Sequence, residues 1–159
     1  MNASAALEQP PHESPMTATT SSMVHALRTA AAHVERAMAW ALEPFGVTAA
    51  QFELLQVIGR HGKSGAGCSE LGKYLAAPGP DVTRMLDRLD SAGLVARKRD
   101  KKDRRVVHTE LTENGENLLQ SAGPAVRKVE LTVFDGLTDS ERAQLAVLLQ
   151  GVRRNCPGN

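Results

Sequence analysis

The stretch VTRMLDRLDSAGLVARKRDKKDRRVVHTEL, residues 82–111, decides the fold of this chain of 159 residues. Its first part has the i, i+3, i+4, i+7 spacing of one buried helix face, which is formed by Val82, Met85, Leu86 and Leu89. Gly93 ends that helix. Residues 94–99 and 105–111 are rich in residues suited to strands, and polar, charged DKKDR lies between them, so we predict a hairpin.

The segments before this stretch predict three more helices. The first runs from Ser22 to before Pro44, and the second follows a capping box of Thr48 and Gln51. A third covers 69–76, after the loop KSGAG, and the helix of the opening stretch covers about 81–92. A short helix, a tight turn, a second helix and a charged hairpin indicate a winged helix-turn-helix.

Two helices are predicted after the hairpin. Thr112 is the expected N-cap of a long helix, which Gly123-Pro124 should kink or interrupt. Thr138 and Glu141 form a second capping box, which opens a C-terminal helix. Its apolar stripe is formed by Leu145, Leu148, Leu149 and Val152. The predicted fold is therefore mainly α, with a small β-hairpin wing.

The charge of the chain is concentrated in one place. The net charge is only +1, but residues 97–105 (RKRDKKDRR) hold seven Lys/Arg and two Asp, a local +5. The rest of the chain holds 12 Lys/Arg against 16 Asp/Glu, or −4. Such a run could be a solvated loop, but its place directly after a helix-turn-helix favours a surface that binds an anionic partner.

Two sets of side chains are candidates for contact with DNA. The helix over 81–92 turns Asp81, Thr83, Arg84, Asp87, Arg88 and Ser91 outward. This face could lie in a major groove, although a solvated, salt-bridged face is the alternative. On the hairpin, we expect Arg97, Lys98 and Arg99 to face phosphates, and Asp100 and Asp103 to orient a neighbouring arginine.

The segment from Ser69 to Gly115 resembles the core of the MarR family of bacterial transcriptional regulators. The matching pieces are VTRMLDRLDSAGLV (82–95), Arg97, the wing DRR (103–105) and LTENG (111–115). A weaker similarity runs from about 22 to 153. The resemblance implies a homodimer that binds a palindromic operator and is released by a small molecule, often a phenolic or aromatic acid.

The resemblance also assigns roles by position. Thr83, Arg84 and Arg88 fall on the recognition helix of the family. Asp103 and Arg105 fall on the Asp-x-Arg pair of the wing, with Arg105 expected in a minor groove and Arg104 at the DNA backbone. The sequence departs from the family at Pro80, where many members carry Ser or another small polar residue.

We divide the chain into four parts. Residues 1–20 are expected to be disordered, because they are rich in Ala, Ser, Thr and Pro and have few large apolar groups. The resemblance implies that residues 21–45 and 112–155 form dimerisation helices and that residues 46–111 form the DNA-binding domain. Packing within one monomer is the alternative for the outer helices. Relatives often border the effector pocket with the first helix, which makes His33, Arg36 and Trp40 candidates; Trp40 could equally fill core.

Other functional classes have little support in the sequence. The histidines and the two cysteines show no metal-ligand spacing, and no catalytic or cofactor-binding motif is present, so we expect neither an enzyme nor a cofactor. No apolar run is long enough to span a membrane, and no secretion signal is visible, which favours a cytoplasmic protein. We predict a ligand-responsive DNA-binding repressor. The alternative is a winged-helix adaptor whose basic wing meets an acidic protein.

Overall fold

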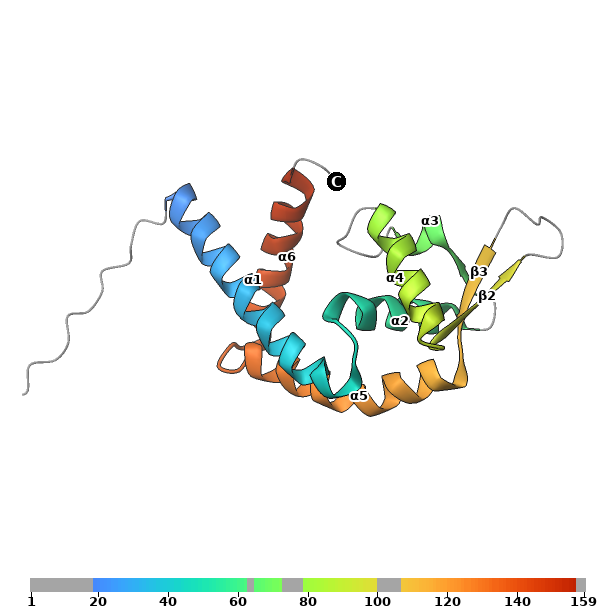
Figure 1. Cartoon of the computed structure of the whole chain (residues 1–159). Coiled ribbons are helices and arrows are strands. Elements are labelled where there is room, and N and C mark those ends of the chain that lie inside the picture. Colours follow the sequence, from blue (N-terminus) through green and yellow to red (C-terminus); the bar gives the residue numbers. More distant parts are fainter. Residues whose placement is uncertain (1–18, 63–64, 73–78, 100–106, 157–159) are drawn as a thin grey trace, which may run out of the picture. The chain divides into compact units, whose positions relative to one another are not determined.

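The computed structural model describes residues 19–62, 65–72, 79–99 and 107–156, and it divides the chain into two compact units, residues 1–33 and 34–159. Figure 1 shows the elements in chain order. They are α1 (Thr20–Leu42), the 3-10 helix η1 (Glu43–Phe45), α2 (Ala49–His61), β1 (Ala66–Gly67), α3 (Cys68–Leu71), α4 (Gly79–Ser91), β2 (Val95–Arg99), β3 (Val107–Leu111), α5 (Glu113–Val133) and α6 (Asp139–Asn155).

The predicted hairpin is confirmed, and it belongs to a sheet of three antiparallel strands in the order β1-β3-β2. Strand β2 pairs with β3 from Val95 opposite Leu111 to Arg99 opposite Val107. Strand β1 was missed, because its two residues were assigned to a loop. The close approach of Gly65 to β3 explains this strand, since a Cβ on Gly65 would lie 3.0 Å from the carbonyl oxygen of Thr109. Gly65 also has a φ of 65°, which favours glycine.

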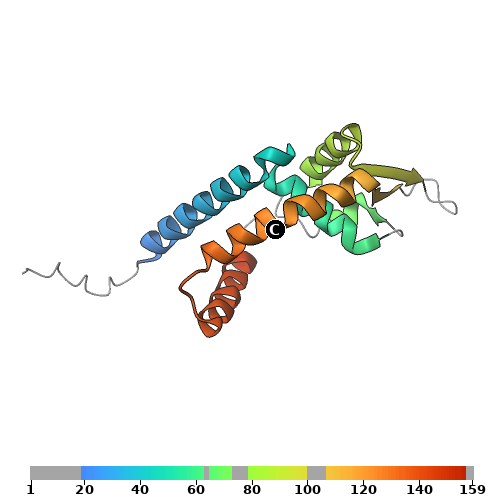
Figure 2. The same cartoon turned by 90° about the horizontal axis from the view of Figure 1, so that it is seen from below.

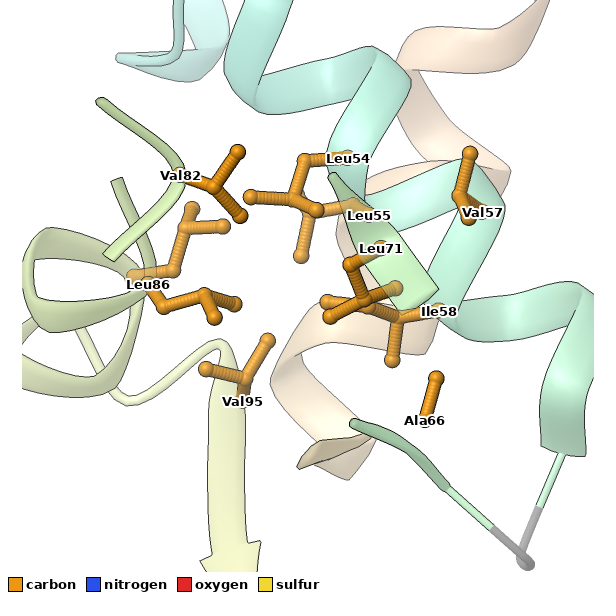
Figure 3. Packing of buried hydrophobic residues seen from close by; sticks show 10 residues of the cluster. Leu54, Leu55, Val57, Ile58, Ala66, Leu71, Val82, Leu86 and Val95 are labelled. Atoms are coloured by element: carbon orange, nitrogen blue, oxygen red, sulfur yellow. The ribbon is translucent and has the colours of Figure 1, made fainter. Parts of the chain in front are cut away.

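The core of the winged-helix part confirms the predicted buried face of α4. Val82, Leu86 and Leu89 are at most 2% exposed, and Met85 is half-buried. Figure 3 shows the side chains of α2, α3, α4, β1 and β2 that converge on this core. Burying one such aliphatic side chain contributes roughly 1.5–3 kcal/mol, so this packing fixes which side of α4 faces outward.

A second core joins the end of α1 to α2 and α5. It consists of Leu42, Val47, Phe52, Ala122 and Val126. The predicted capping box that starts α2 is present, since the Gln51 backbone N–H donates to Thr48 Oγ1 at 3.2 Å and the Thr48 N–H donates to Gln51 Oε1 at 2.9 Å. Figure 2, viewed from below, shows α5 running along this part of the molecule beside α2, which it contacts.

Of the two outcomes predicted for Gly123-Pro124, a kink or an interruption, the interruption is wrong. The helix is continuous from Glu113 to Val133 with Pro124 inside it. The ring of Pro124 removes one N–H donor, and the carbonyl that loses its partner belongs to Gln120 one turn earlier. Because Gln120 is exposed, water can satisfy that carbonyl, and the packing of Ala122 and Val126 holds both halves of the helix in place.

The boundaries of the other helices agree with the sequence to within a few residues. Helix α4 begins two residues before the expected 81, because Pro80 fits the first turn of a helix. Helix α3 covers Cys68–Leu71, and residues 73–76 of the predicted helix lie outside the described residues. Thr112 and Thr138 cap α5 and α6 as predicted. Among the described helices, none is long and apolar enough to cross a membrane.

Candidate nucleic-acid interface

The outer face of α4 presents the polar side chains that the sequence predicted. Thr83, Arg84, Asp87, Arg88 and Ser91 are all exposed, opposite the buried apolar face. The backbone of Asp81 lies in the helix, but its side chain is outside the described residues. Two arginines one turn apart and a threonine on a rigid helix can donate to base edges or to phosphates.

An ion pair joins α4 to the wing. Arg97 Nη2 on β2 donates to Asp87 Oδ1 on α4 at 2.6 Å, with the two side chains 30% and 58% exposed. Figure 1 shows β2 beside α4, and these elements are in contact. From the sequence we expect Arg97 to face phosphates, and Asp87 to belong to a salt-bridged face of α4 only as the alternative. The pair between the two residues was not predicted. The tight turn at Gly93, which returns β2 along α4, was the signal that could have revealed the pair.

The second cation on the wing strand is also paired. Lys98 Nζ makes an ion pair with Glu110 Oε1 on β3, across the hairpin. Arg99, the next residue, is exposed. Asp103, Arg104 and Arg105, which the sequence placed at the tip of the wing, lie outside the described residues. The base of the wing is therefore held by ion pairs on both of its strands.

The LTENG motif closes the base of the wing against α5. Thr112 Oγ1 donates to the carbonyl oxygen of Gly93 at 2.7 Å and accepts from the Gly115 N–H at 3.1 Å. The Thr112 N–H donates to the carbonyl oxygen of Leu94 at 3.1 Å. Gly115 lies so close to Leu94 that an added Cβ would collide with that carbonyl oxygen. The motif thus fixes the end of the hairpin to the first turn of α5.

The three residues predicted to border an effector pocket lie on α1. All three side chains are exposed, and Trp40 is 70% exposed. Trp40 lines a cavity of about 540 Å³ with residues of α1, η1 and α2, whereas His33 and Arg36 do not line this cavity. His33 is the last residue of the first unit, and Arg36 and Trp40 belong to the second.

Sequence comparisons place this interface in a known family. A model described as "MarR family" matches residues 47–107, which include α2, α4 and β2 and end at the first residue of β3. The chain is 30% identical over 113 residues to the HTH-type transcriptional repressor MdtR of Bacillus subtilis, which covers 71% of this chain and 72% of MdtR. It is also 30% identical over 105 residues to the uncharacterized HTH-type transcriptional regulator YkoM of B. subtilis, which covers 66% and 67% of the two chains.

Solved structures agree with these matches. A cysteine-to-serine mutant of MarR from E. coli in complex with operator DNA superposes with a TM-score of 0.74 at 30% identity, over 82% of this chain and 92% of that one. BpsR from Bordetella bronchiseptica, whose DNA binding is regulated by 6-hydroxynicotinic acid, has a TM-score of 0.73 at 27% identity, over 82% and 98%. The MepR–DNA complex from S. aureus, at 24% identity and a TM-score of 0.78 over 87% and 98%, shows the same fold.

The fold, the exposed recognition face and these similarities point to one class of protein. This class consists of transcription regulators and is not an enzyme family. A protein–protein adaptor, the alternative that the sequence left open, is not favoured. The chain belongs to the MarR family of winged-helix, DNA-binding transcriptional regulators.

Proposed function

We propose that this protein is a repressor that binds a palindromic operator as a homodimer and leaves it when a small-molecule effector binds. The observation that carries the proposal is the outer face of α4, where Thr83, Arg84 and Arg88 are exposed while the opposite face is locked into the core. The basic hairpin next to α4 supplies the positive charge that phosphates attract.

In this proposal α4 lies in the major groove. Arg84 and Arg88 donate to guanine edges or to phosphates, and Thr83 contacts a base or a thymine methyl group. Arg97 and Lys98 face the DNA backbone at the base of the wing, where their ion-pair partners fix their direction. At the wing tip, Arg105 enters the minor groove, Asp103 orients it, and Arg104 meets the backbone.

The dimer is supported by apolar side chains that the chain itself leaves exposed. They gather on the end of α5 and on α6, which has no buried residue, and they are Leu131, Val133, Phe134, Val147, Leu148, Leu149 and Val152. A further set on α1 consists of Met23, Val24 and Leu27. Exposed apolar side chains in such number favour a protein interface. We assign residues 46–111 to DNA binding and residues 21–45 and 112–155 to dimerisation.

The named relatives support the same function. MdtR is a transcriptional repressor, MarR from E. coli has been solved on its operator DNA, and the DNA binding of BpsR is regulated by 6-hydroxynicotinic acid. For the effector, we propose a contact from the first helix, with Trp40, which lines a cavity, as the candidate. The steric mechanism is simple: the bound dimer blocks polymerase, and the effector favours a dimer whose recognition helices no longer match the two half-sites.

A gel-shift scan tests the proposed function. Overlapping duplexes that cover the region upstream of the protein's own gene are titrated with the protein at low and at moderate salt. We expect one fragment with an inverted repeat to shift, with an affinity that falls steeply as salt rises, because phosphate contacts release counterions. If no fragment shifts at low salt, or if all fragments shift equally, the proposal of a specific operator at this locus is wrong.

A further inference from the structure

A cavity of about 560 Å³ lies between α1, α2, α4 and α5, entirely within the second unit. Its apolar lining includes Met38 on α1, Phe52 on α2, Met85 on α4 and Val126 on α5. Phe52 and Val126 are 2% and 3% exposed, so they form a well-packed floor. The volume falls within the range of sites for small organic ligands, and the two methionines can adapt to the shape of an apolar guest.

The charges on the lining of this cavity all have the same sign. Glu35, Glu53 and Glu130 line it, whereas no Lys, Arg or His among the described residues does. All three glutamates are exposed, and within the described part of the chain none of them takes part in an ion pair. The apolar floor is therefore bordered by three carboxylates whose charge this part of the protein leaves uncompensated.

The groove continues towards the one tryptophan of the chain. The cavity beside Trp40 shares Glu35, Ala49 and Ala50 with the larger cavity and adds Glu43 to the acidic lining. Trp40 is 70% exposed, so much of its indole ring is accessible to a ligand. Such a ring attracts cations through its quadrupole, most strongly where carboxylates lie nearby.

We propose that this groove binds a lipophilic organic cation, a molecule with an apolar aromatic body and one positive charge. The inference rests on the proposed function, because it names the chemical class of the effector. An aromatic acid, which the family resemblance had suggested, would place its carboxylate among Glu35, Glu53 and Glu130, where Coulomb repulsion opposes binding. A cation gains attraction from the same carboxylates and buries its apolar body against Phe52 and Met85.

The position of Met85 connects this site to DNA binding. Met85 lies on α4, the proposed recognition helix, directly after Arg84. Its side chain is half-buried and lines the cavity. A ligand in the cavity therefore touches the recognition helix as well as α1 and α5. A ligand shifts an equilibrium only when it contacts the two states differently. A movement of α4 would change the contact with Met85, so this shared wall could provide that difference.

The experiment is isothermal titration calorimetry of the full-length protein without DNA, with two probes of nearly equal shape and opposite charge. Tetraphenylphosphonium is the cation, tetraphenylborate is the anion, and salicylate serves as an aromatic acid. We expect the cation to bind roughly tenfold or more tightly than either anion, because several nearby carboxylates each contribute a few-fold. Tighter binding of either anion, or no heat of binding with the cation, would overturn the proposal.

A pair of variants locates the site. The double variant Glu53→Gln/Glu130→Gln should weaken binding of the cation about tenfold, whereas Glu113→Gln/Glu116→Gln, with the same change of charge on α5 but outside this cavity, should leave it unchanged. Circular dichroism melts of all variants confirm that they fold. An equal loss of affinity in the two double variants would show that the cation binds through overall charge, and the groove would be excluded.

A parallel titration separates this inference from the proposed function. Operator binding by the ligand-free protein tests DNA recognition, and it does not involve the groove. If the cation binds in the groove but does not release the operator, the assigned ligand class is upheld and the release step of the proposed function is wrong. If the operator is released by salicylate and not by tetraphenylphosphonium, DNA recognition is upheld and the inference of a cation is wrong.

Discussion

Helices α4 and α6 have the same kind of apolar stripe, but only α4 buries its stripe within the chain. Leu86 and Leu89 on α4 are 2% and 1% exposed, whereas Leu148 and Val152 on α6 are 60% and 45% exposed. Helix α4 is therefore positioned by its own fold, and its polar face is held ready for DNA. Helix α6 leaves its stripe exposed, which fits the homodimer that we propose.

The largest expected effect concerns the closure of the winged-helix part. In Gly115→Ala the new Cβ meets the carbonyl oxygen of Leu94, and neither backbone can yield, so we expect a loss of about 3 kcal/mol or more in the free energy of unfolding. Urea denaturation measures this change. Gly123→Ala on the same helix is the control, because an added Cβ there meets nothing within 4 Å. Equal stability of the two variants would contradict this view of the LTENG motif.

The next effect concerns the exposed stripe of α6. Leu148→Asp introduces a charge into the proposed dimer interface, so we expect monomers in sedimentation velocity at micromolar concentration. Operator affinity should fall about a hundredfold, because a monomer engages one half-site without the advantage of linkage to the second. The control is Gln150→Asp, which places the same charge two residues further along α6. If Leu148→Asp remains a dimer, α6 does not lie in the interface.

A smaller effect is expected on the polar face of α4. Arg84→Ala should cost about 1–3 kcal/mol in operator binding and relax the preference at one base pair, because a guanine contact would be lost. Fluorescence anisotropy with a set of single-base operator variants measures both changes. The control is Arg127→Ala on α5, which removes the same charge outside the proposed DNA-binding face. A uniform loss on all sequences would show instead that Arg84 contacts a phosphate.

The ion pair between Asp87 on α4 and Arg97 on β2 allows two opposite predictions for operator binding by Asp87→Ala. Removal of Asp87 takes a negative charge from the DNA-binding face, so simple electrostatics predicts tighter binding. If Asp87 instead orients Arg97, Asp87→Ala should weaken operator binding about two- to fivefold, as expected for a partly exposed pair. A cycle with Arg97→Ala and the double variant, measured by anisotropy, distinguishes the two. Tighter binding by Asp87→Ala would refute the positioning role.

The smallest effect concerns the cap of α6. The hydrogen bonds from the Thr138 backbone N–H and from its hydroxyl lower the pKa of Glu141 below its ordinary value. This contribution to the helix is therefore present above the ordinary pKa of a glutamate, and it is lost as pH falls through the lowered one. Thr138→Ala should raise the pKa of Glu141, as measured by NMR of its carboxyl carbon. An unchanged pKa would show that the hydroxyl is not involved.

Features formed by residues close in the sequence could be predicted, whereas contacts between residues far apart in the sequence could not. The capping boxes at Thr48 and Thr138 involve residues three apart, so their chemistry is visible in the sequence. Strand β1 was missed because its two residues have no strand preference of their own and are held by the approach of Gly65 to Thr109. The formation of strand β1 therefore depends on a tertiary contact and not on the strand propensity of its residues.

In the candidate site, too, local features could be predicted and tertiary contacts could not. The outward face of α4 followed from the period of its apolar residues, and the structure confirms that Thr83, Arg84 and Arg88 are exposed. The partners of the wing cations, Asp87 for Arg97 and Glu110 for Lys98, were not predicted. They depend on the angle at which the hairpin returns along α4 and on the register of its strands, and neither is encoded in local spacing.

The most direct test of the central claim is the stoichiometry of the complex with DNA. Sedimentation of the protein with a palindromic operator fragment, and with the same fragment cut to one half-site, measures how many chains each duplex carries. We predict two chains on the full operator and at least a hundredfold weaker binding to the half-site, because in the proposed dimer α6 and the end of α5 join two recognition helices. A single chain bound with equal affinity to both fragments would contradict the account.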